Sequence, residues 1–192
     1  LSEMSAISSR TILKFVSEFI DRGIITNYEK NKSTGGRNAE RLTIRPYAVK
    51  ENAKRWYIIA YCVERKGLRV YGLDRVLSLE ATDNVFKMPK AFDIDEMFAT
   101  SFGIYLPDGH GQKITFRTSH TEARFLRDLP IHKSQKEIAS DNDSVTFSIF
   151  VSPNKALIME FCKYGGGLEV LGPESVRSQV AAELARAADL YR

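Results

Sequence analysis

Apolar residues along the first half of the chain predict one helix followed by closely spaced strands. In residues 7–21 they recur three and four positions apart, the spacing of one face of an amphipathic helix, and Gly23 stands where such a helix would end. Strand-like runs follow at residues 24–30, 41–47, 55–63 and 68–80, with turn-rich segments between them. One helix and four or five short strands predict a small β-barrel.

The second half of the chain follows a different order of elements. Its pattern predicts strands at residues 112–118, 131–139, 143–151 and 168–171, and helices at residues 120–128, 153–164 and 173–191. The order βαββαβ, with a further helix at the end, predicts a ferredoxin-like α+β domain over residues 112–192. Residues 106–111, which contain helix- and strand-breaking Pro and Gly, are the predicted linker from a first domain of residues 1–105.

The first helix and the strands after it also imitate the recognition helix and wing of a winged-helix DNA-binding domain. A helix that begins near residues 8–11 is followed by a basic loop between two strands, as in that fold. A winged helix needs two further helices before the recognition helix, and this sequence does not supply them. Because the later strands continue the pattern of a barrel, we favour the barrel.

The strand predicted at residues 55–63 carries aromatic side chains on both faces. In its sequence RWYIIAY, Trp56 lies on one face while Arg55 and Tyr57 lie on the other, because successive side chains of a strand alternate. Large aromatic residues usually belong to the core. We therefore expect Trp56, the only tryptophan, to face the core and Tyr57 to face a ligand.

Positive charge is concentrated in one segment of the chain. The 192 residues have a formal net charge of +4, but residues 22–75 hold thirteen Lys and Arg against five Asp and Glu, a net charge of +8. The remainder of the chain is therefore acidic. Such asymmetry indicates an anionic partner for the basic segment, although a solvated basic face without a ligand fits the same counts.

Composition and cysteine usage are typical of a soluble cytoplasmic protein. Hydrophobic residues make up 43% and charged residues 27% of the sequence, which is ordinary for a globular fold. No apolar run approaches the roughly 20 residues of a membrane-spanning helix, and no secretory signal pattern opens the chain. Cys62 and Cys162 lie in separate apolar runs, as expected for two buried thiols in a reducing compartment.

Recognisable catalytic and metal-binding patterns are absent from the sequence. The three histidines, His110, His120 and His132, lack metal-ligand spacing with each other or with the cysteines. Three consecutive glycines at residues 165–167 follow a helix and precede a strand, the reverse of a phosphate-binding loop. No known nucleophile or nucleotide-hydrolase motif occurs. We therefore expect no enzymatic activity, no catalytic residue, no metal and no cofactor.

Three motifs of the first half, in their order and spacing, resemble the WYL domain. They are LTIRPY at residues 42–47, RWYIIAY at residues 55–61 and LRVYGLDRV at residues 68–76. Trp56, Tyr57 and Ile58 stand where the family has its Trp-Tyr-Leu triplet. The second half resembles the C-terminal extension that commonly follows this domain, through the runs LPIHKSQ and LEVLGPE. The resemblance covers nearly the whole chain.

This resemblance implies a Sm-like, SH3-type small β-barrel that acts as the ligand sensor of a bacterial transcription regulator. Members of the family have been linked to nucleotide or nucleic-acid ligands, single-stranded DNA among them. The helix-turn-helix or winged-helix domain with which such regulators bind promoter DNA would have to lie before Leu1, or the protein would be a standalone sensor. The resemblance also favours a homodimer.

A basic and aromatic face of the predicted barrel is the candidate ligand site. Along residues 68–76, Arg69, Tyr71 and Arg75 alternate onto one face, where guanidinium groups can bind phosphates while the ring stacks on a base. Residues of the neighbouring strand and of the turn before it extend this face. The candidate ligand-binding residues are Arg69, Arg75, Tyr71, Tyr57, Arg55, Tyr47 and Lys50.

Other roles fit the same residues. Tyr57 and Tyr71 also suit simple packing with an exposed hydroxyl, and Asp74 beside Arg75 suits an ion pair that would occupy one guanidinium. The barrel and its extension also suit a protein-interaction module that dimerises or docks an acidic protein without any nucleic acid. The salt dependence of binding, and its dependence on Arg69 and Arg75, separate the two functions.

Overall fold

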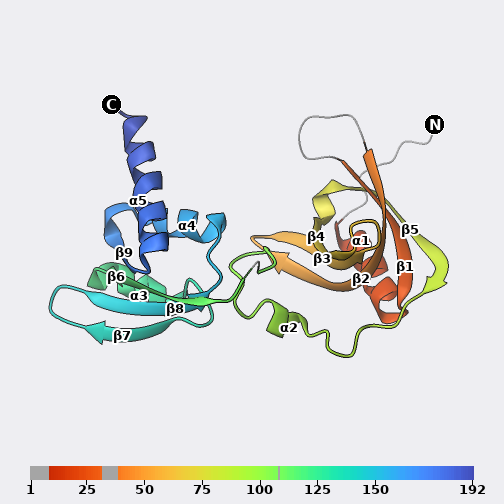
Figure 1. The fold of residues 1–192 in the computed structure, drawn as a ribbon, viewed down its shortest axis with the longest axis horizontal. Helices are drawn as coiled ribbons and strands as arrows, with labels where there is room; N and C mark the ends of the chain where they lie inside the picture. Colours follow the sequence, from red (N-terminus) through yellow and green to blue (C-terminus); the bar gives the residue numbers. More distant parts are fainter. Residues whose placement is uncertain (1–8, 32–38, 108) are drawn as a thin grey trace. The chain divides into compact units, whose positions relative to one another are not determined.

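The chain folds into two compact units, each with its own hydrophobic core. The structure, a computed structural model, describes residues 9–31, 39–107 and 109–192. The first unit ends at Ile94 and the second begins at Asp95. Each unit combines helices with an antiparallel sheet (Figure 1), so the predicted α+β class is confirmed. The linker at residues 106–111 stays a prediction, and its residue 108 lies outside the described residues.

In its described residues, the first unit contains one α-helix before a five-stranded sheet. Its elements are α1 (Ser9–Asp21), β1 (Ile24–Asn31), β2 (Ala39–Asn52), β3 (Arg55–Cys62), β4 (Gly67–Gly72), the 3-10 turn η1 (Leu73–Arg75) and β5 (Val76–Val85). The strands lie in the order β4-β3-β2-β1-β5, and neighbours are antiparallel. Among the described strands, β4 and β5 are the two edges of the sheet and do not pair with each other. The prediction of a closed barrel is therefore wrong. After η1 the chain turns away, and β5 pairs with β1 instead of β4.

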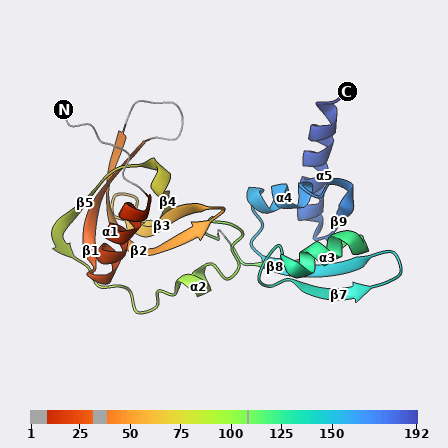
Figure 2. The same ribbon diagram turned by 180° about the vertical axis from the view of Figure 1, so that it is seen from behind.

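The core of the first unit lies between α1 and one face of the sheet. Seen from behind, α1 lies across β1 and β2 (Figure 2). Val16 of α1 packs with Tyr28, Ile58 and Tyr71, all of which are buried. Trp56 packs against the same cluster, so its expected position on the core face is confirmed.

The second unit follows the predicted order βαββαβ, with a further helix at the end. Its elements are α2 (Ile94–Met97) at the junction, β6 (Gln112–Thr118), α3 (His120–Asp128), β7 (Lys136–Ser140), β8 (Val145–Val151), α4 (Lys155–Cys162), the 3-10 turn η2 (Gly165–Gly167), β9 (Leu168–Gly172) and α5 (Glu174–Asp189). The strands lie in the order β7-β8-β6-β9, all antiparallel. β7 starts later than predicted because the chain forms a turn before it. The Gln135 side chain stabilises this turn, since its oxygen accepts a hydrogen bond from the Ile131 amide and its NH₂ group donates one to the Leu126 carbonyl.

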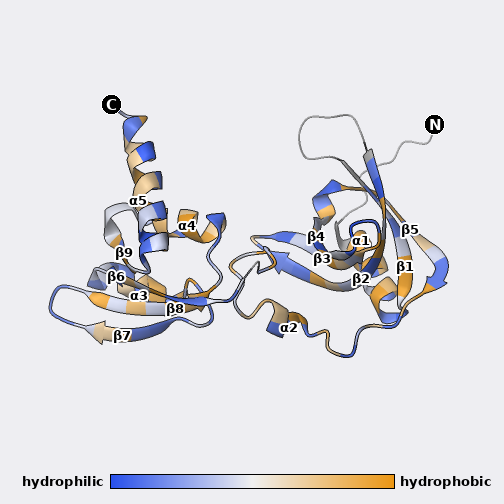
Figure 3. Ribbon diagram, in the orientation of Figure 1, coloured by the Kyte–Doolittle hydropathy of each residue, from blue (hydrophilic) through white to orange (hydrophobic). Residues whose placement is uncertain are grey.

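Helices α3, α4 and α5 all contribute to one core, on a single face of the second sheet. Strand β8 buries Phe147 and Ile149 on that face, whereas Phe150 points to the opposite face and is 48% exposed. β8 is largely hydrophobic (Figure 3), whereas every residue of the edge strand β7 is exposed. The alternation along β8 therefore decides which face the helices cover.

His132 ties the segment around Ser101 to the turn before β7. The Nδ1 atom of its ring lies 2.7 Å from the Ser134 hydroxyl oxygen, and the ring also hydrogen-bonds the backbone of Ser101. Burial lowers the pKa of His132, and the charge of Lys133 lowers this pKa further. The neutral imidazole is therefore the form that fits the folded unit.

Acidification is expected to destabilise the second unit through His132. Because the pKa of His132 is lower in the folded than in the unfolded chain, the unfolded chain binds the proton more readily, and stability falls as the pH drops below about 6.5. Urea unfolding followed by circular dichroism, at pH values on both sides of this point, measures the fall. His132→Gln should flatten the pH dependence, and an unchanged pH dependence would contradict this role of His132.

Candidate ligand-binding site

Two of the candidate aromatic residues belong to the core. Tyr71 is 3% exposed, and the centroid of its ring lies 4.8 Å from that of Tyr28. Tyr47 is 8% exposed, and its ring packs against the rings of Phe86 and Phe92. A buried ring cannot stack on a base, so the prediction that Tyr71 and Tyr47 face a ligand is wrong.

The remaining candidates do not share one face of the sheet. Across β3 and β4, Arg69 stands opposite Ala60, whereas Tyr57 stands opposite Gly72. Ala60 and Tyr57 are three positions apart in one strand and point to opposite faces. Arg75 belongs to η1, which interrupts the strand predicted over residues 68–80, so strand alternation does not place it. The prediction that the candidate residues share one face is therefore wrong. Arg69 and Tyr57 point to opposite faces, and the strand ends before Arg75.

Arg69 and Arg75 are nevertheless exposed cations. The Nη1 atom of Arg69 donates a hydrogen bond to the Leu68 carbonyl oxygen, 2.6 Å away. Asp74 does not pair with Arg75; its carboxylate lies 3.7 Å from the guanidinium of Arg55. This contact joins two exposed side chains and is weak. Among the residues that the structure describes, neither Arg69 nor Arg75 has an acidic partner.

Tyr57 lies on the sheet face that points away from the core, between Lys50 of β2 and Gly72 of β4. A Cβ atom at Gly72 would lie 3.7 Å from the Tyr57 ring and 2.5 Å from a carboxylate oxygen of Asp74. Glycine therefore permits the close approach of both side chains. Half-buried Tyr57, half-buried Lys50 and exposed Arg55 form a second basic and aromatic group at this end of the sheet.

Arg45 is a further cation on this face of the sheet, and the sequence did not single it out as a ligand-binding residue. The register of β2 and β3 places Arg45 opposite Tyr61, and the guanidinium carbon lies 5.5 Å from the centroid of the Tyr61 ring. The register shifts between Pro46 and Ala48, directly after Arg45. Because proline lacks an amide N–H, Pro46 inside a strand was the one sequence signal of this irregularity.

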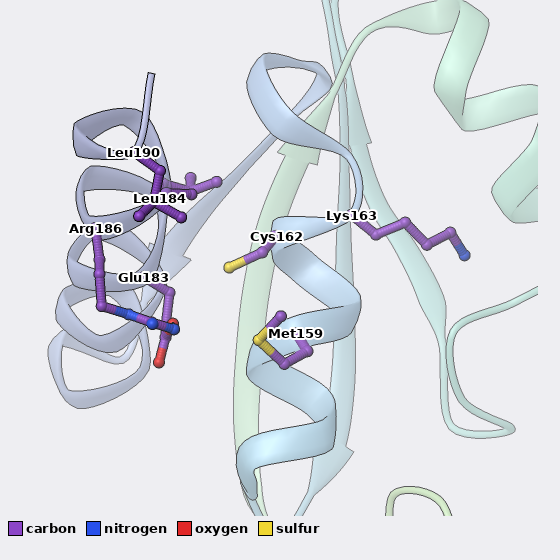
Figure 4. Close-up of a pocket in the computed structure, with 8 residues that line it drawn as sticks. Met159, Cys162, Lys163, Glu183, Leu184, Arg186 and Leu190 are labelled. Carbon is purple, nitrogen blue, oxygen red and sulfur yellow. The ribbon is translucent and has the colours of Figure 1, made fainter. Parts of the chain in front are cut away.

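The second unit contains an apolar groove between α4 and α5. The groove has a volume of about 370 Å³ and is lined by Met159 and Cys162 of α4, by Leu184 of α5 and by Leu190, which directly follows α5 (Figure 4). Burial raises the pKa of the Cys162 thiol, which makes it a poor nucleophile near neutral pH. None of the candidate ligand-binding residues lines this groove.

Within the described ranges, no group of three or more His, Cys, Asp or Glu side chains could hold a metal ion. None of the helices that the structure describes has the length and apolar character needed to cross a membrane.

Comparisons with known proteins agree with the two-unit fold. The WYL domain family matches residues 24–81, and the WCX domain family matches residues 110–188. The chain is similar to a solved CRISPR Cas-related protein, with 14% identity and a TM-score of 0.53, over 94% of this chain and 51% of that chain. It is also similar to the proteasome accessory factor B/C (PafBC) of Arthrobacter aurescens, with 18% identity and a TM-score of 0.40, over 99% of this chain and 28% of that chain. No curated protein matches the sequence.

Each matched domain corresponds to one unit of the fold. The WYL match begins with β1 and ends within β5, and the WCX match begins just before β6 and ends within α5. This pair of domains supports, in general terms, a regulatory sensing domain. The chain belongs to the WYL-domain family, with a WCX domain as its second unit. The resemblance seen in the sequence motifs is thereby confirmed.

Proposed function

We propose that the protein senses an anionic ligand, a single-stranded nucleic acid or a nucleotide, at the exposed cations of its first unit. Ligand binding would modulate promoter binding by a helix-turn-helix domain outside this chain. In this proposal the protein is a homodimeric cytoplasmic regulator without enzymatic activity or a cofactor. The observation that carries the proposal is the pair Arg69 and Arg75, exposed on β4 and η1 and without an acidic partner in the described part of the chain.

The chemistry of these side chains favours phosphate groups. A guanidinium presents parallel N–H donors that match two oxygens of one phosphate, and it stays charged at any physiological pH. Arg69 lies on an edge strand, where a long side chain can reach beyond the sheet. On the opposite face of the sheet, Tyr57 offers a half-buried ring for stacking, with Arg55 and Lys50 beside it. Cations combined with an aromatic ring hold single-stranded nucleic acid without reading its sequence.

We also propose specific folds for the two units. A helix, five antiparallel strands and a 3-10 turn before the last strand support an open form of the Sm-like, SH3-type fold for the first unit. In the second unit, the first and third strands of the βαββαβ order are central, and the second and fourth are edges. This arrangement supports a ferredoxin-like fold.

Substituting Arg69 or Arg75 by alanine is expected to weaken the binding of a short single-stranded DNA. Fluorescence anisotropy of the labelled DNA, titrated with the protein at two salt concentrations, measures the affinity and its salt dependence. Each lost phosphate contact should lower the slope of log affinity against log salt by about 0.7. The loss should be roughly tenfold in affinity for each variant, as expected for one charge-assisted contact.

Arg41→Ala is the matched control, because it removes the same charge from an exposed arginine that pairs with Glu80 at 2.7 Å. Its effect on DNA binding should be small. Equal losses in all three variants would indicate unspecific attraction to positive charge. Binding that persists unchanged in Arg69→Ala and Arg75→Ala would place the ligand elsewhere.

A protein-interaction function is the alternative, and exposed apolar residues of the second unit favour it. Leu190 and Tyr191 are 80% and 91% exposed beside the groove between α4 and α5. A second copy of the chain is the occupant that the family resemblance suggests. In that case the DNA titration should show no salt-sensitive binding, since an apolar interface hardly responds to salt.

A further inference from the structure

The second unit has one sheet face that its helices α3, α4 and α5 do not cover. All three helices pack on the face that contains Phe116 and Phe147. Alternate side chains of the two central strands, β6 and β8, point to the opposite face, which we call the open sheet face. On these two strands the side chains of the open sheet face are Lys113, Thr115, Arg117, Thr146, Ser148 and Phe150.

Phe150 is the one large apolar side chain that the central strands place on the open sheet face, and its position is fixed. The backbone N–H of Phe150 donates a hydrogen bond to the Ser134 hydroxyl oxygen, 2.8 Å away. A Cβ atom at Gly111 would lie 2.6 Å from a ring carbon of Phe150, so glycine lets the ring lie against the backbone there. The residue is nevertheless 48% exposed. A base can stack on an exposed ring that is already ordered.

Positive charge predominates on the open sheet face. The edge strands add Lys136, which stands opposite Ser148, and Glu169, which stands opposite Arg117. The four strands therefore place three cations and one carboxylate on this face. The carboxylate of Glu169 is occupied, because it pairs with Arg117 at 2.6 Å. Lys113 and Lys136 are exposed and have no acidic partner in the described part of the chain.

These two lysines flank Phe150 on both sides of its strand. Lys113 of β6 stands directly opposite Phe150, and Lys136 belongs to β7, which pairs with the other side of β8. Opposite side chains of antiparallel strands are near neighbours, and a lysine side chain is long and flexible. A ring between two cations can accept a base between two phosphates of one chain. A duplex does not fit this arrangement, because its bases are already paired and stacked.

We propose that the open sheet face binds single-stranded nucleic acid, with one base stacked on the Phe150 ring and the flanking phosphates at Lys113 and Lys136. A four-stranded sheet that stacks unpaired bases on aromatic side chains is a general way to hold single strands. The inference goes beyond the proposed function, because it assigns a second contact surface that does not need Arg69. Charge counts along the sequence gave no sign of this surface, since the chain outside residues 22–75 is acidic overall.

The test titrates a short labelled single-stranded DNA with the whole chain and follows its fluorescence anisotropy. Phe150→Leu keeps an apolar side chain but removes the ring, so affinity should fall about tenfold, as expected for one stacked base. Phe150→Tyr keeps the ring and should bind like the wild type. Phe125→Leu is the matched control, because Phe125 is 64% exposed on α3, outside the open sheet face. The same DNA as a duplex should not distinguish Phe150→Leu from the wild type.

Lysine substitutions test the phosphate contacts separately from the ring. Lys113→Ala and Lys136→Ala should each lower the slope of log affinity against log salt by about 0.7, the value for one phosphate contact of a single strand. Lys163→Ala removes the same charge from a lysine that follows α4 and pairs with Glu160 at 2.7 Å, so it should leave the slope unchanged. Equal changes in all three variants would indicate attraction to net charge alone and would overturn the inference.

Photocrosslinking locates the stacked base without relying on affinity. Single-stranded DNA that carries iododeoxyuridine, irradiated in complex with the wild type, should crosslink to a peptide that contains Phe150, which mass spectrometry identifies. Phe150→Leu should lose this crosslink while its unfolding curve stays close to that of the wild type. Crosslinks that lie only in the first unit would overturn the inference.

The outcomes separate this surface from the proposed site in the first unit. If Arg69→Ala weakens DNA binding but Phe150→Leu does not, the inference is overturned and the proposed function survives. If only Phe150→Leu weakens binding, the open sheet face holds the single strand and the proposed site at Arg69 falls. If Phe150→Leu changes the oligomeric state in sedimentation and leaves DNA binding unchanged, the face belongs to a contact with a second copy of the chain, and the inference is overturned.

Discussion

Replacing Tyr28 by alanine is expected to lower the free energy of unfolding of the first unit by about 3 to 5 kcal/mol, the range for a large aromatic core residue. Tyr28 is fully buried in β1, and its ring packs 4.8 Å from that of Tyr71. Its removal leaves a cavity between α1 and the sheet. Urea unfolding followed by fluorescence measures the loss, because Trp56 is the only tryptophan and packs against the same core.

The variant Tyr28→Phe separates the ring from its hydroxyl. That hydroxyl is buried without a hydrogen-bond partner in the part of the chain that the structure describes, and burial raises its pKa. Removing an unpaired buried hydroxyl removes a desolvation cost, so Tyr28→Phe should leave stability within about 1 kcal/mol of the wild type or increase it. A loss as large as that of Tyr28→Ala would mean that the hydroxyl, and not the ring, stabilises this core.

Replacing Phe147 by alanine is expected to lower the stability of the second unit by a similar amount, about 3 to 5 kcal/mol. Phe147 is buried in the central strand β8, and its ring stacks on that of Phe116, with the ring centroids 5.7 Å apart. The ring of Phe116 in turn contacts Phe161 of α4, so the cavity would lie where the sheet meets its helices. Urea unfolding followed by circular dichroism measures the change, while Trp56 fluorescence follows the first unit separately.

Phe150→Ala is the matched control in the same strand. Phe150 lies three positions from Phe147 and points to the other face of the sheet, where it is about half exposed. Its substitution should cost less than about 1 kcal/mol, as for other partly exposed positions. Equal losses in the two variants would show that both faces of β8 are covered, contrary to the single helical layer of this unit.

Much of the fold could be predicted from local spacing in the sequence. The amphipathic stripe predicted α1, and alternation in RWYIIAY placed Trp56 on the core face, because each pattern depends only on neighbouring residues. Closure of the first sheet could not be predicted in this way. It depends on whether β5 pairs with β4 or with β1, which lies some fifty residues earlier in the chain.

The candidate site was harder to predict than the fold. Alternation along residues 68–76 separates two sets of side chains but does not say which set faces the core. In the structure Tyr71 pairs with Ile58 of the neighbouring strand and both are buried, so the set that contains Tyr71 faces the core. The interruption at η1 then removes Arg75 from the strand. Arg45 was missed because its contact with the Tyr61 ring is made across the ladder, and spacing along the chain does not show such a contact.

The sequence by itself determined the α+β class, the WYL-domain family and the concentration of positive charge in residues 22–75, because all three depend on composition and local order. Only the tertiary structure decided which side chains of that basic segment a ligand can reach. The pairing of β3 with β4 buries Tyr71, and the pairing of β2 with β3 sets Arg45 against Tyr61. Burial and hydrogen-bond satisfaction arise from contacts between distant parts of the chain, and local spacing does not encode those contacts.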